Sequence, residues 1–547
     1  MYQIMDARTN MWAARLGEFT RGVPSWLLLT GVLLLATACW AVLQTALPYL
    51  GHDEAVYAGK ARSWLTGDPA PQWDPRRAPG MPALGYLALA VHPSAGAVRL
   101  AGLVLLLGTM AVVYAVGAAW IGRVGAAVAS VVVLAGTGFF RRTPEFLSDI
   151  ASAGLLLAVA YFLVRAQERP RSPALLAAPV CALAALYVRY GALAGLGALG
   201  LAAVVVWGPR AWLAQGRWLV GAIAIFVGGL VPHLVYATKV TGSPFGLLVA
   251  AGESASPGYV GDGLVYYVAS FPFGLAGPLG GVVMAAGLVA GGLAARRLLR
   301  DRLRRESDPG RAAEDRRTVF LALTAVLLAV LLGFTAHGEP RFVFLSVIVL
   351  TILGVRPLAR WAGRWGRRSG SSRWRRWSPA MLPGIGVLAL VSLPLTYAFL
   401  APSLARTTQA RASLVALAER FQSVGGQGPA RPAVSGPAVS GPAVSGPAES
   451  GPAESGPAGS AEGRECVLVS SYQPELGWYS GCATAAFWQA RQGALPAAGV
   501  ASYVLFANGR DQPSEAQIRS LADDRPIEVV ELVAAGSLGR VRILTVR

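Results

Sequence analysis

The sequence predicts a polytopic α-helical membrane protein that ends in a small α/β domain. Hydrophobic residues make up 54% of the chain and charged residues only 14%, with a mean hydropathy of +0.50, which is far from the balance of a soluble protein. Long uncharged apolar runs recur from Pro24 to about Leu400. Such runs suit helices that cross the hydrocarbon of a bilayer, which takes about 20 residues each. After Leu400 the composition changes, and a soluble C-terminal part is expected.

The net charge of +19 does not indicate a nucleic-acid partner. The positive residues are almost all arginines in short loops between apolar runs. Membrane topology requires such a distribution, because basic loops favour the cytoplasmic side. We therefore expect a multi-pass protein of the plasma membrane, with membrane lipid and no nucleic acid among its partners.

Eleven spans account for the apolar runs. The stretch 173–207 is ambiguous, since it could form one long span or two short ones. Two spans, separated near 188–191, place the arginine-rich loops 296–317 and 356–376 inside, as the positive-inside tendency requires, whereas one span places both outside. The N-terminus, 1–24, is then cytoplasmic and the C-terminus extracytoplasmic. The expected spans of this membrane domain, 25–400, are 25–47, 100–121, 124–140, 150–164, 173–188, 191–207, 218–238, 264–295, 318–336, 342–356 and 379–400.

Two parts of the membrane domain are irregular. The run 264–295 is longer than most, which predicts a helix that is broken, or begins on the surface, at Phe271-Pro272. The first outer loop, 48–99, should hold a helix from Asp53 to Leu65 and an apolar stretch from Pro79 to Val91. This stretch has 13 residues, too few to span, and suits a helix in the plane of the interface.

Two segments follow the membrane domain. Residues 424–464 carry a five-residue repeat, SGPAV and then SGPAE, which cannot bury a core and predicts a disordered spacer. Residues 465–547 predict an extracytoplasmic α/β domain. Its strands are expected at 466–469, 502–506, 527–532 and 540–546, and its helix at 514–522.

The cysteines divide into two pairs. Cys466 and Cys482 lie in the C-terminal domain, where a disulfide between them is plausible if the domain is extracytoplasmic. Cys39 and Cys181 lie inside apolar runs, where inert packing is expected.

An acidic pair, Asp53-Glu54, comes directly after the first span. Two carboxylates are costly in a region that is even partly buried, so they need partners or a task. The structural alternative is a solvated helix start, in which Asp53 caps the helix and Glu54 suits its dipole. Asp149 poses the same choice at the start of the span 150–164, as an N-cap or as a second acid on the outer side.

A third polar cluster, which includes His337, Glu339 and Arg341, separates two apolar runs. Arg341 can grip two phosphate oxygens at once, or it can pair with Glu339 or reach lipid headgroups. Further cations on the predicted outer side are Arg189, Lys239, Arg76 and Arg77.

The predicted topology places these acids and cations on one membrane face. A carboxylate there can take the proton from an attacking hydroxyl, and an arginine can stabilise a departing phosphate. The apolar bundle can hold a polyprenyl tail. Together these groups suit transfer from a lipid-linked phosphate donor.

The motifs resemble those of a known family. Asp53-Glu54-Ala55-Val56-Tyr57, in a helix that ends at Leu65-Thr66-Gly67, resembles the first-loop motif of the GT-C membrane glycosyltransferases. It is most similar to the branch with the protein O-mannosyltransferases and the lipid A aminoarabinose transferases. Ser148-Asp149 resembles their second acidic motif, and the segment 337–342 resembles a late-helix motif of several GT-C families. The likeness covers about 25–400.

The resemblance implies an inverting transfer from a polyprenyl-phosphate sugar to an extracytoplasmic acceptor, which could be a protein, a lipid or a cell-wall glycan. It implies Asp53 as the base, with Glu54 and Asp149 beside it, and Arg341 or Arg189 near the donor phosphate. Its remaining substrate-binding residues are His337, Glu339, Tyr57, Arg76 and Arg77. The chain departs from the aminoarabinose branch at 77–82, where Arg77-Ala78-Pro79-Gly80-Met81-Pro82 replaces a Lys-Pro-Pro-Leu-like stretch. The role of that lysine would pass to Arg76 or Arg77.

Two other functions stay open at this point. A transporter or flippase of a lipid-linked sugar would also need outer cations and a groove for the tail, although the sequence lacks the paired repeats of many transporters. A non-catalytic envelope assembly protein would act through its C-terminal domain. No organic cofactor is expected, and the need for a divalent cation is left open.

Overall fold

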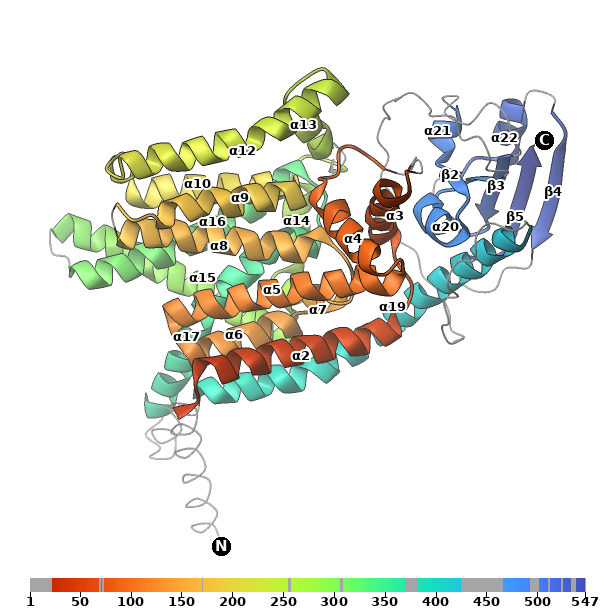
Figure 1. Ribbon diagram of the computed structural model, residues 1–547. Coiled ribbons are helices and arrows are strands. Elements are labelled where there is room, and N and C mark those ends of the chain that lie inside the picture. Colours follow the sequence, from red (N-terminus) through yellow and green to blue (C-terminus); the bar gives the residue numbers. More distant parts are fainter. Residues whose placement is uncertain are drawn as a thin grey trace, which may run out of the picture. The chain divides into compact units, whose positions relative to one another are not determined.

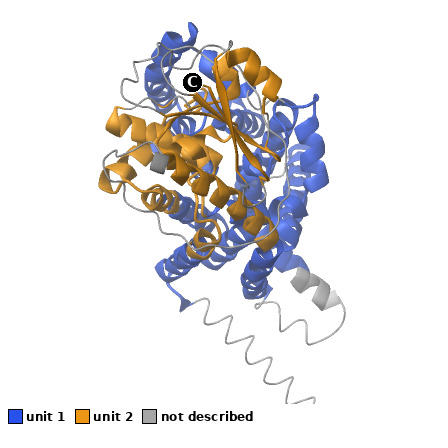
Figure 2. Ribbon diagram, turned by 90° about the vertical axis from the view of Figure 1, so that its right-hand side faces the viewer, with its two compact units in different colours: residues 1–40, 104–143, 148–399 blue, residues 41–103, 144–147, 400–547 orange. Residues whose placement is uncertain are grey.

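The structure is a computed structural model that divides into two compact units (Figure 2). Unit 1 comprises 1–40, 104–143 and 148–399, and unit 2 comprises 41–103, 144–147 and 400–547. The residues that the structure describes are 22–67, 70, 73–169, 171–253, 257–304, 308–368, 381–424, 466–491, 501–509, 512–522, 525–532 and 538–546. The expected spacer, 424–464, lies outside them apart from its first residue, as do residues 1–21 of the N-terminus.

The membrane-spanning architecture is confirmed. Among the described residues, eight helices are long and apolar enough to cross a bilayer. They are α2 (Ser25–Ala46), α5 (Ala95–Ile121), α8 (Ser148–Glu168), α12 (Arg217–Thr241), α15 (Phe273–Arg304), α16 (Pro309–Thr335), α17 (Phe344–Arg368, entered through the short helix η1, Pro340–Val343) and α19 (Met381–Val424).

The three remaining predicted spans form shorter helices. They are α6 (Arg123–Ala135), α9 (Ala174–Val188) and α10 (Ala192–Trp207), of 13, 15 and 16 residues. Because these lengths fall short of the usual 20 residues, eleven full crossings remain a prediction. The division of 173–207 into two helices is confirmed, since Arg189 adopts an extended conformation and ends α9.

The long run 264–295 is broken where the sequence predicted. Helix α14 (Asp262–Ser270) ends at Phe271, whose extended backbone precedes Pro272. Helix α15 begins directly after this proline and contains Gly277 at a φ of +72°. A residue before proline avoids the helical region, so the break follows from local chemistry. Further short helices of unit 1 are α7 (Thr137–Arg142), α11 (Pro209–Leu213) and α13 (Gly246–Glu253).

Close packing of small residues joins the helices of unit 1. Helices α15 and α17 approach so tightly that a Cβ at Gly287 would collide with the Leu350 carbonyl, and one at Gly354 with the Val283 carbonyl. Such contacts are typical of membrane helices, which gain stability from packing rather than from excluding water. Helices α8, α9, α10 and α12 lie side by side (Figure 1). The result is a tight frame for the helix ends that carry the polar residues.

Unit 2 contains a helical hairpin and a mixed sheet. Helix α3 (His52–Thr66) packs against α4 (Gly80–Val91), where the sequence predicted both helices (Figure 1). The sheet has the order β2-β1-β3-β5-β4, in which β1 pairs parallel with β2 and β3, and β5 pairs antiparallel with β3 and β4. Its strands are β1 (Val467–Val469), β2 (Ala483–Ala485), β3 (Ala501–Phe506), β4 (Ile527–Leu532) and β5 (Val541–Val546).

A small core stabilises this sheet. Tyr503, Leu544 and Val546 pack against Ile518 of α22 (Glu515–Ala522). Four strands and this helix lie where the sequence predicted them. Strand β2 and the helices α20 (Gln473–Ser480) and α21 (Phe487–Arg491) were not predicted, because each is short and lacks a clear hydrophobic period.

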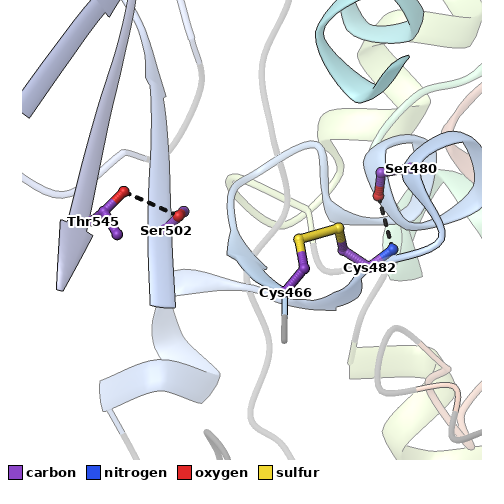
Figure 3. The surroundings of a disulfide bond; sticks show 5 residues. All are labelled: Cys466, Ser480, Cys482, Ser502 and Thr545. Carbon is purple, nitrogen blue, oxygen red and sulfur yellow. Dashed lines mark hydrogen bonds between the residues drawn. A yellow bond between two sulfur atoms is a disulfide. The ribbon is translucent and has the colours of Figure 1, made fainter. Parts of the chain in front are cut away.

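A disulfide joins Cys466 and Cys482 at the starts of β1 and β2, with their Cα atoms 5.2 Å apart (Figure 3). The Cys482 amide donates a hydrogen bond to Ser480 Oγ at 3.0 Å. On the far side of β1, Ser502 and Thr545 share a hydroxyl hydrogen bond of 3.2 Å between β3 and β5 (Figure 3). Because α20 lies between the two cysteines in the sequence, the disulfide closes the loop that contains this helix.

Candidate active site

Five charged side chains of unit 1 form what we term the α8–η1 cluster. Asp149 lies in the first turn of α8, and Arg189 lies in the link between α9 and α10. Glu339 and Arg341 flank the start of η1, and Arg142 ends α7. All five stand at helix ends or in links, where the backbone leaves the regular helix and side chains can converge.

Asp149 is the centre of the α8–η1 cluster. Its side chain is only 2% exposed, so its charge needs compensation. Its Oδ1 lies 2.5 Å from Arg189 Nη1, and its Oδ2 lies 4.0 Å from Arg341 Nη1. Arg189 Nη1 also donates to the Ser148 hydroxyl at 3.4 Å. Two guanidinium groups thus approach one buried carboxylate from two sides.

The ring of Phe342 lies close to both guanidinium groups. The Arg189 guanidinium lies 5.0 Å from the centre of the Phe342 ring, and that of Arg341 lies 5.5 Å from it. Cations are attracted to such ring faces. The ring also meets His337 edge-on at 5.4 Å between centroids. Phe342 therefore orients the two arginines toward the same region.

Glu339 is the second acid of the α8–η1 cluster. It contacts Arg341 Nε directly, and its Oε1 lies 3.9 Å from Arg142 Nη2. The cluster therefore contains three arginines and two carboxylates, which leaves a net charge of +1. A further anion would find a favourable site here.

A small cavity of about 30 Å³ opens beside the α8–η1 cluster. Asp149, Arg189, Arg341 and Phe342 line its polar side. Gly195 lines it too, where a Cβ would lie 2.6 Å from Leu156 Cδ1. The space suits about one water molecule. A larger anion would enter only if an arginine side chain turned from its carboxylate toward the ligand.

Asp53 belongs to a separate group in unit 2, which we term the α3 cluster. Its Oδ1 accepts a hydrogen bond of 2.7 Å from Arg77 Nη1. The Arg77 guanidinium lies 5.6 Å from the Tyr57 ring centre, and Tyr57 meets Phe146 edge-on at 6.4 Å. Asp53 keeps about a quarter of its side chain exposed. It is therefore held in place and remains partly exposed.

Glu54, its neighbour, lies in a buried ionic network. The side chain is 1% exposed and the Arg99 side chain is fully buried. Glu54 Oε2 lies 2.9 Å from Arg99 Nη2 and 3.8 Å from Arg411 Nη1. Both oxygens also accept backbone hydrogen bonds, from Gly51 at 2.8 Å and Phe146 at 2.9 Å. With both oxygens occupied, Glu54 is suited to holding the start of α3.

The network extends through Arg411 of α19. Arg411 Nη2 lies 3.0 Å from Glu145, and Nη1 donates to the Tyr49 carbonyl at 2.9 Å. Glu145 and Arg411 thus continue the chain of alternating charges that begins at Arg99. The buried Arg99 and the partly buried Arg411 face two buried carboxylates, so the charges balance.

The C-terminal domain also contacts α3 within unit 2. His52 Nδ1 lies 3.3 Å from Glu475 Oε2 of α20. Burial by itself would lower the pKa of His52, but the carboxylates of Glu475 and Asp53 outweigh it and raise that pKa above its usual value. Arg62 donates to the Trp478 and Gly477 carbonyls at 3.1 Å each. The start and the middle of α3 therefore both depend on α20.

The predicted residues thus separate into two groups. Unit 1 brings together Asp149, Arg189, Glu339 and Arg341, with His337 against Phe342. Unit 2 brings together Asp53, Tyr57 and Arg77. Arg76 instead binds Asp74, with 2.6 Å between Nη2 and Oδ2.

Four charged residues of these groups were not predicted: Arg99, Arg142, Glu145 and Arg411. The position of Arg99 could have indicated its role, because an arginine beside an apolar run usually has an acidic partner. Glu145 and Arg411 lie 266 residues apart in sequence, and nothing local in the sequence links them.

Within the described ranges, no three His, Cys, Asp or Glu side chains gather as metal ligands. Asp149 and Glu339 are instead paired with arginines. No step proposed here depends on a metal.

Comparison with known proteins gives a likeness in fold. No protein-family model matches the chain, and no curated protein matches it in sequence. The structure is similar to that of ArnT from Cupriavidus metallidurans bound to undecaprenyl phosphate, with a TM-score of 0.60 and 14% identity over 95% of this chain and 98% of that one. The apo state of the same ArnT matches with a TM-score of 0.56, 14% identity and coverage of 95% and 97%. The chain has the GT-C fold.

In this fold, the motif residues lie at helix starts. Asp53 stands in the first turn of α3, Asp149 in the first turn of α8, and Arg341 in η1 just before α17. Helix starts present free backbone N–H groups and a partial positive charge. Both features favour acidic side chains and anionic ligands at these positions.

Proposed function

We propose that the chain is a membrane glycosyltransferase that moves a sugar from a polyprenyl-phosphate donor to an extracytoplasmic acceptor. The α8–η1 cluster carries this proposal. Two arginines, both stacked on Phe342, converge on a buried carboxylate beside a cavity. Guanidinium groups bind phosphate through paired hydrogen bonds. The GT-C fold, and the undecaprenyl phosphate bound to the similar ArnT, support a lipid-linked donor.

The donor phosphate would replace the carboxylates as the partner of the arginines. Arg189 is held by Asp149 and Arg341 by Glu339, so both cations stay ordered when no anion is bound. The phosphodiester of the donor carries one negative charge, as a carboxylate does, and the phosphate gains a second charge as it leaves, which the arginines would stabilise. The exchange keeps each arginine paired with an anion.

The transfer would proceed by inversion. Asp53 takes the proton from an acceptor hydroxyl while the oxygen of this hydroxyl bonds to the anomeric carbon of the sugar. The bond from that carbon to the phosphate oxygen breaks, and its electron pair leaves with the polyprenyl phosphate. Arg189 and Arg341 stabilise the charge that develops on this leaving group. Glu54 acts as a positioning residue, because its oxygens are already occupied.

The proposed orientation follows from the arginines of the membrane domain. The end of unit 1 that includes Arg297, Arg311 and Arg356 would face the cytoplasm, as the positive-inside tendency favours. The α8–η1 cluster and the C-terminal α/β domain would then be extracytoplasmic. The Cys466–Cys482 disulfide supports this orientation, since such bonds persist in oxidising compartments.

Liposomes that contain the full chain provide the test. They would be supplied with a panel of undecaprenyl-phosphate sugars, radiolabelled in the sugar, and with an extract of envelope lipids, glycans and proteins. We expect label to pass to one acceptor class, with an inverted anomeric bond. If the label crosses the bilayer while it remains on undecaprenyl phosphate, the chain is a flippase and the proposal is wrong.

A further inference from the structure

Five arginines surround a second cavity in unit 1, far from the α8–η1 cluster. This cavity, of about 330 Å³, lies among the end of α5, the second half of α15, the start of α16 and the second half of α17. Helix α16 runs from this cavity toward η1, and the 25 residues from Arg311 to Thr335 span about 36 Å at the usual helical rise. The two sites therefore lie at opposite ends of the bundle. The arginines are Arg297, Arg311, Arg317, Arg356 and Arg360.

Two of these arginines are bound to acids. Arg297 Nη2 lies 2.5 Å from Oδ1 of the buried Asp315, and its Nε donates to Oδ2 at 2.9 Å. Arg317 Nη1 lies 3.1 Å from Glu168, and the Arg317 guanidinium lies 6.0 Å from the ring centre of Trp120. These contacts fix two walls of the cavity.

The other three arginines have no ion-pair partner among the residues that the structure describes. Arg311, Arg356 and Arg360 are all exposed and line the cavity. With Asp315 and Glu314 as the acids of the lining, five positive and two negative charges leave +3. An anion is therefore the ligand that the charges favour.

The remaining walls are apolar. Leu293, Leu321, Ile352 and Trp361 also line the cavity. A free phosphate ion would use the arginines and leave these walls in contact with water. An amphiphile with a phosphate headgroup would use both, because its tail covers the apolar walls. Tryptophan and arginine are also the residues that anchor proteins at the headgroup level.

We propose that this cavity binds the phosphate headgroup of an anionic membrane lipid. Arg356 and Arg360 hold the phosphate, and the apolar walls hold the first carbons of the tail. The proposal needs only the membrane-spanning fold and is independent of the glycosyltransferase activity. It gives a role to the cavity arginines that have no acidic partner among the described residues.

Lipid binding to the purified full chain provides the test. The probe is a short-chain phosphatidylglycerol, and binding is followed by native mass spectrometry and by the shift of the unfolding midpoint. We expect Arg356→Gln/Arg360→Gln to weaken the apparent affinity about 30-fold, which corresponds to roughly 1 kcal/mol for each arginine. The matched control, Arg296→Gln/Arg300→Gln, removes the same charge from exposed arginines of α15 outside the cavity and should change the affinity less than about threefold.

Three comparisons make the outcome decisive. Phosphatidylcholine, which has no net charge, and inorganic phosphate, which has no tail, should each protect far less than phosphatidylglycerol. Equal protection by either compound, or equal loss in the control variant, would overturn the proposal. Should the double glutamine variant fail to fold, Arg356→Lys/Arg360→Lys keeps the charge and should weaken binding by less. The single variants Arg356→Gln and Arg360→Gln would be measured separately. If neither changes the affinity for phosphatidylglycerol, the proposed site is wrong.

Discussion

At the scale of single residues, Arg189 and Arg341 differ in the carboxylates that they contact. Arg189 compensates the buried Asp149 at 2.5 Å, whereas Arg341 lies 4.0 Å from it and contacts the more exposed Glu339. Removing a partner from a buried charge is strongly destabilising. Loss of Arg189 should therefore affect folding as well as activity, and loss of Arg341 mainly activity.

We predict that Arg341→Gln lowers the rate of sugar transfer about 10²-fold, the effect of removing one donor that stabilises developing charge, with little change in the unfolding midpoint. Transfer from labelled undecaprenyl-phosphate sugar and a thermal scan would measure the two effects. Arg217→Gln, at the start of α12 outside the α8–η1 cluster, is the control. Normal transfer by Arg341→Gln would remove this arginine from the reaction.

Substitutions at the neighbouring residues Asp53 and Glu54 should have different effects, one on the transfer rate and the other on stability. Asp53→Asn keeps the size of a partly exposed side chain, so we predict a stable protein whose transfer rate falls at least 10²-fold, as for loss of a general base. Glu54→Gln leaves the buried Arg99 without its carboxylate, and we predict a loss of about 3 kcal/mol in unfolding free energy. Circular dichroism melts beside transfer assays would separate the two. Full transfer by a folded Asp53→Asn protein would refute the assignment of the base.

At the scale of elements, α3 is held by groups that come from distant parts of unit 2. Arg99 of α5, Arg411 of α19 and Glu475 of α20 all reach its first turn. The sequence predicts the helix itself from its apolar pattern and its early acids. It does not predict these partners, because nothing in the sequence around Arg99, Arg411 or Glu475 links them to α3.

The contact between α3 and α20 should depend on pH. The carboxylates of Glu475 and Asp53 raise the pKa of His52 above its value in the unfolded chain. Stability from this contact is therefore complete below a pH of about 6.5, the unfolded pKa, and is lost as pH rises through the folded pKa. We predict slower hydrogen exchange of the first turn of α3 at pH 6 than at pH 8.5, after correction for intrinsic rates. His52→Gln should remove most of this difference, and an equal pH dependence in that variant would contradict the assignment.

At the scale of the whole molecule, the sequence predicts elements better than it predicts their grouping. Apolar length locates the eight long helices, and the proline at 272 locates the break before α15. The division into two compact units is harder to predict from the sequence. Unit 2 combines the first outer loop, four residues at 144–147 and everything after 399. Buried ion pairs such as Glu145–Arg411 join these pieces, and no local pattern encodes a pairing across 266 residues. Helix α19 likewise continues to Val424, well beyond the apolar run that ends near Leu400.

This grouping makes the disulfide a local constraint rather than a global one. The Cys466–Cys482 bond closes a loop of 16 residues around α20, and such a loop contributes about 3 kcal/mol through the unfolded state. We predict that Cys466→Ser/Cys482→Ser speeds hydrogen exchange in the sheet and in α20, while exchange in α15 to α17 of unit 1 stays unchanged. Because α20 supplies Glu475 to His52 and the Trp478 carbonyl to Arg62, exchange at α3 should rise too. An effect confined to the sheet would show that α3 is held without α20, and an effect on all helices would show that the two units unfold together.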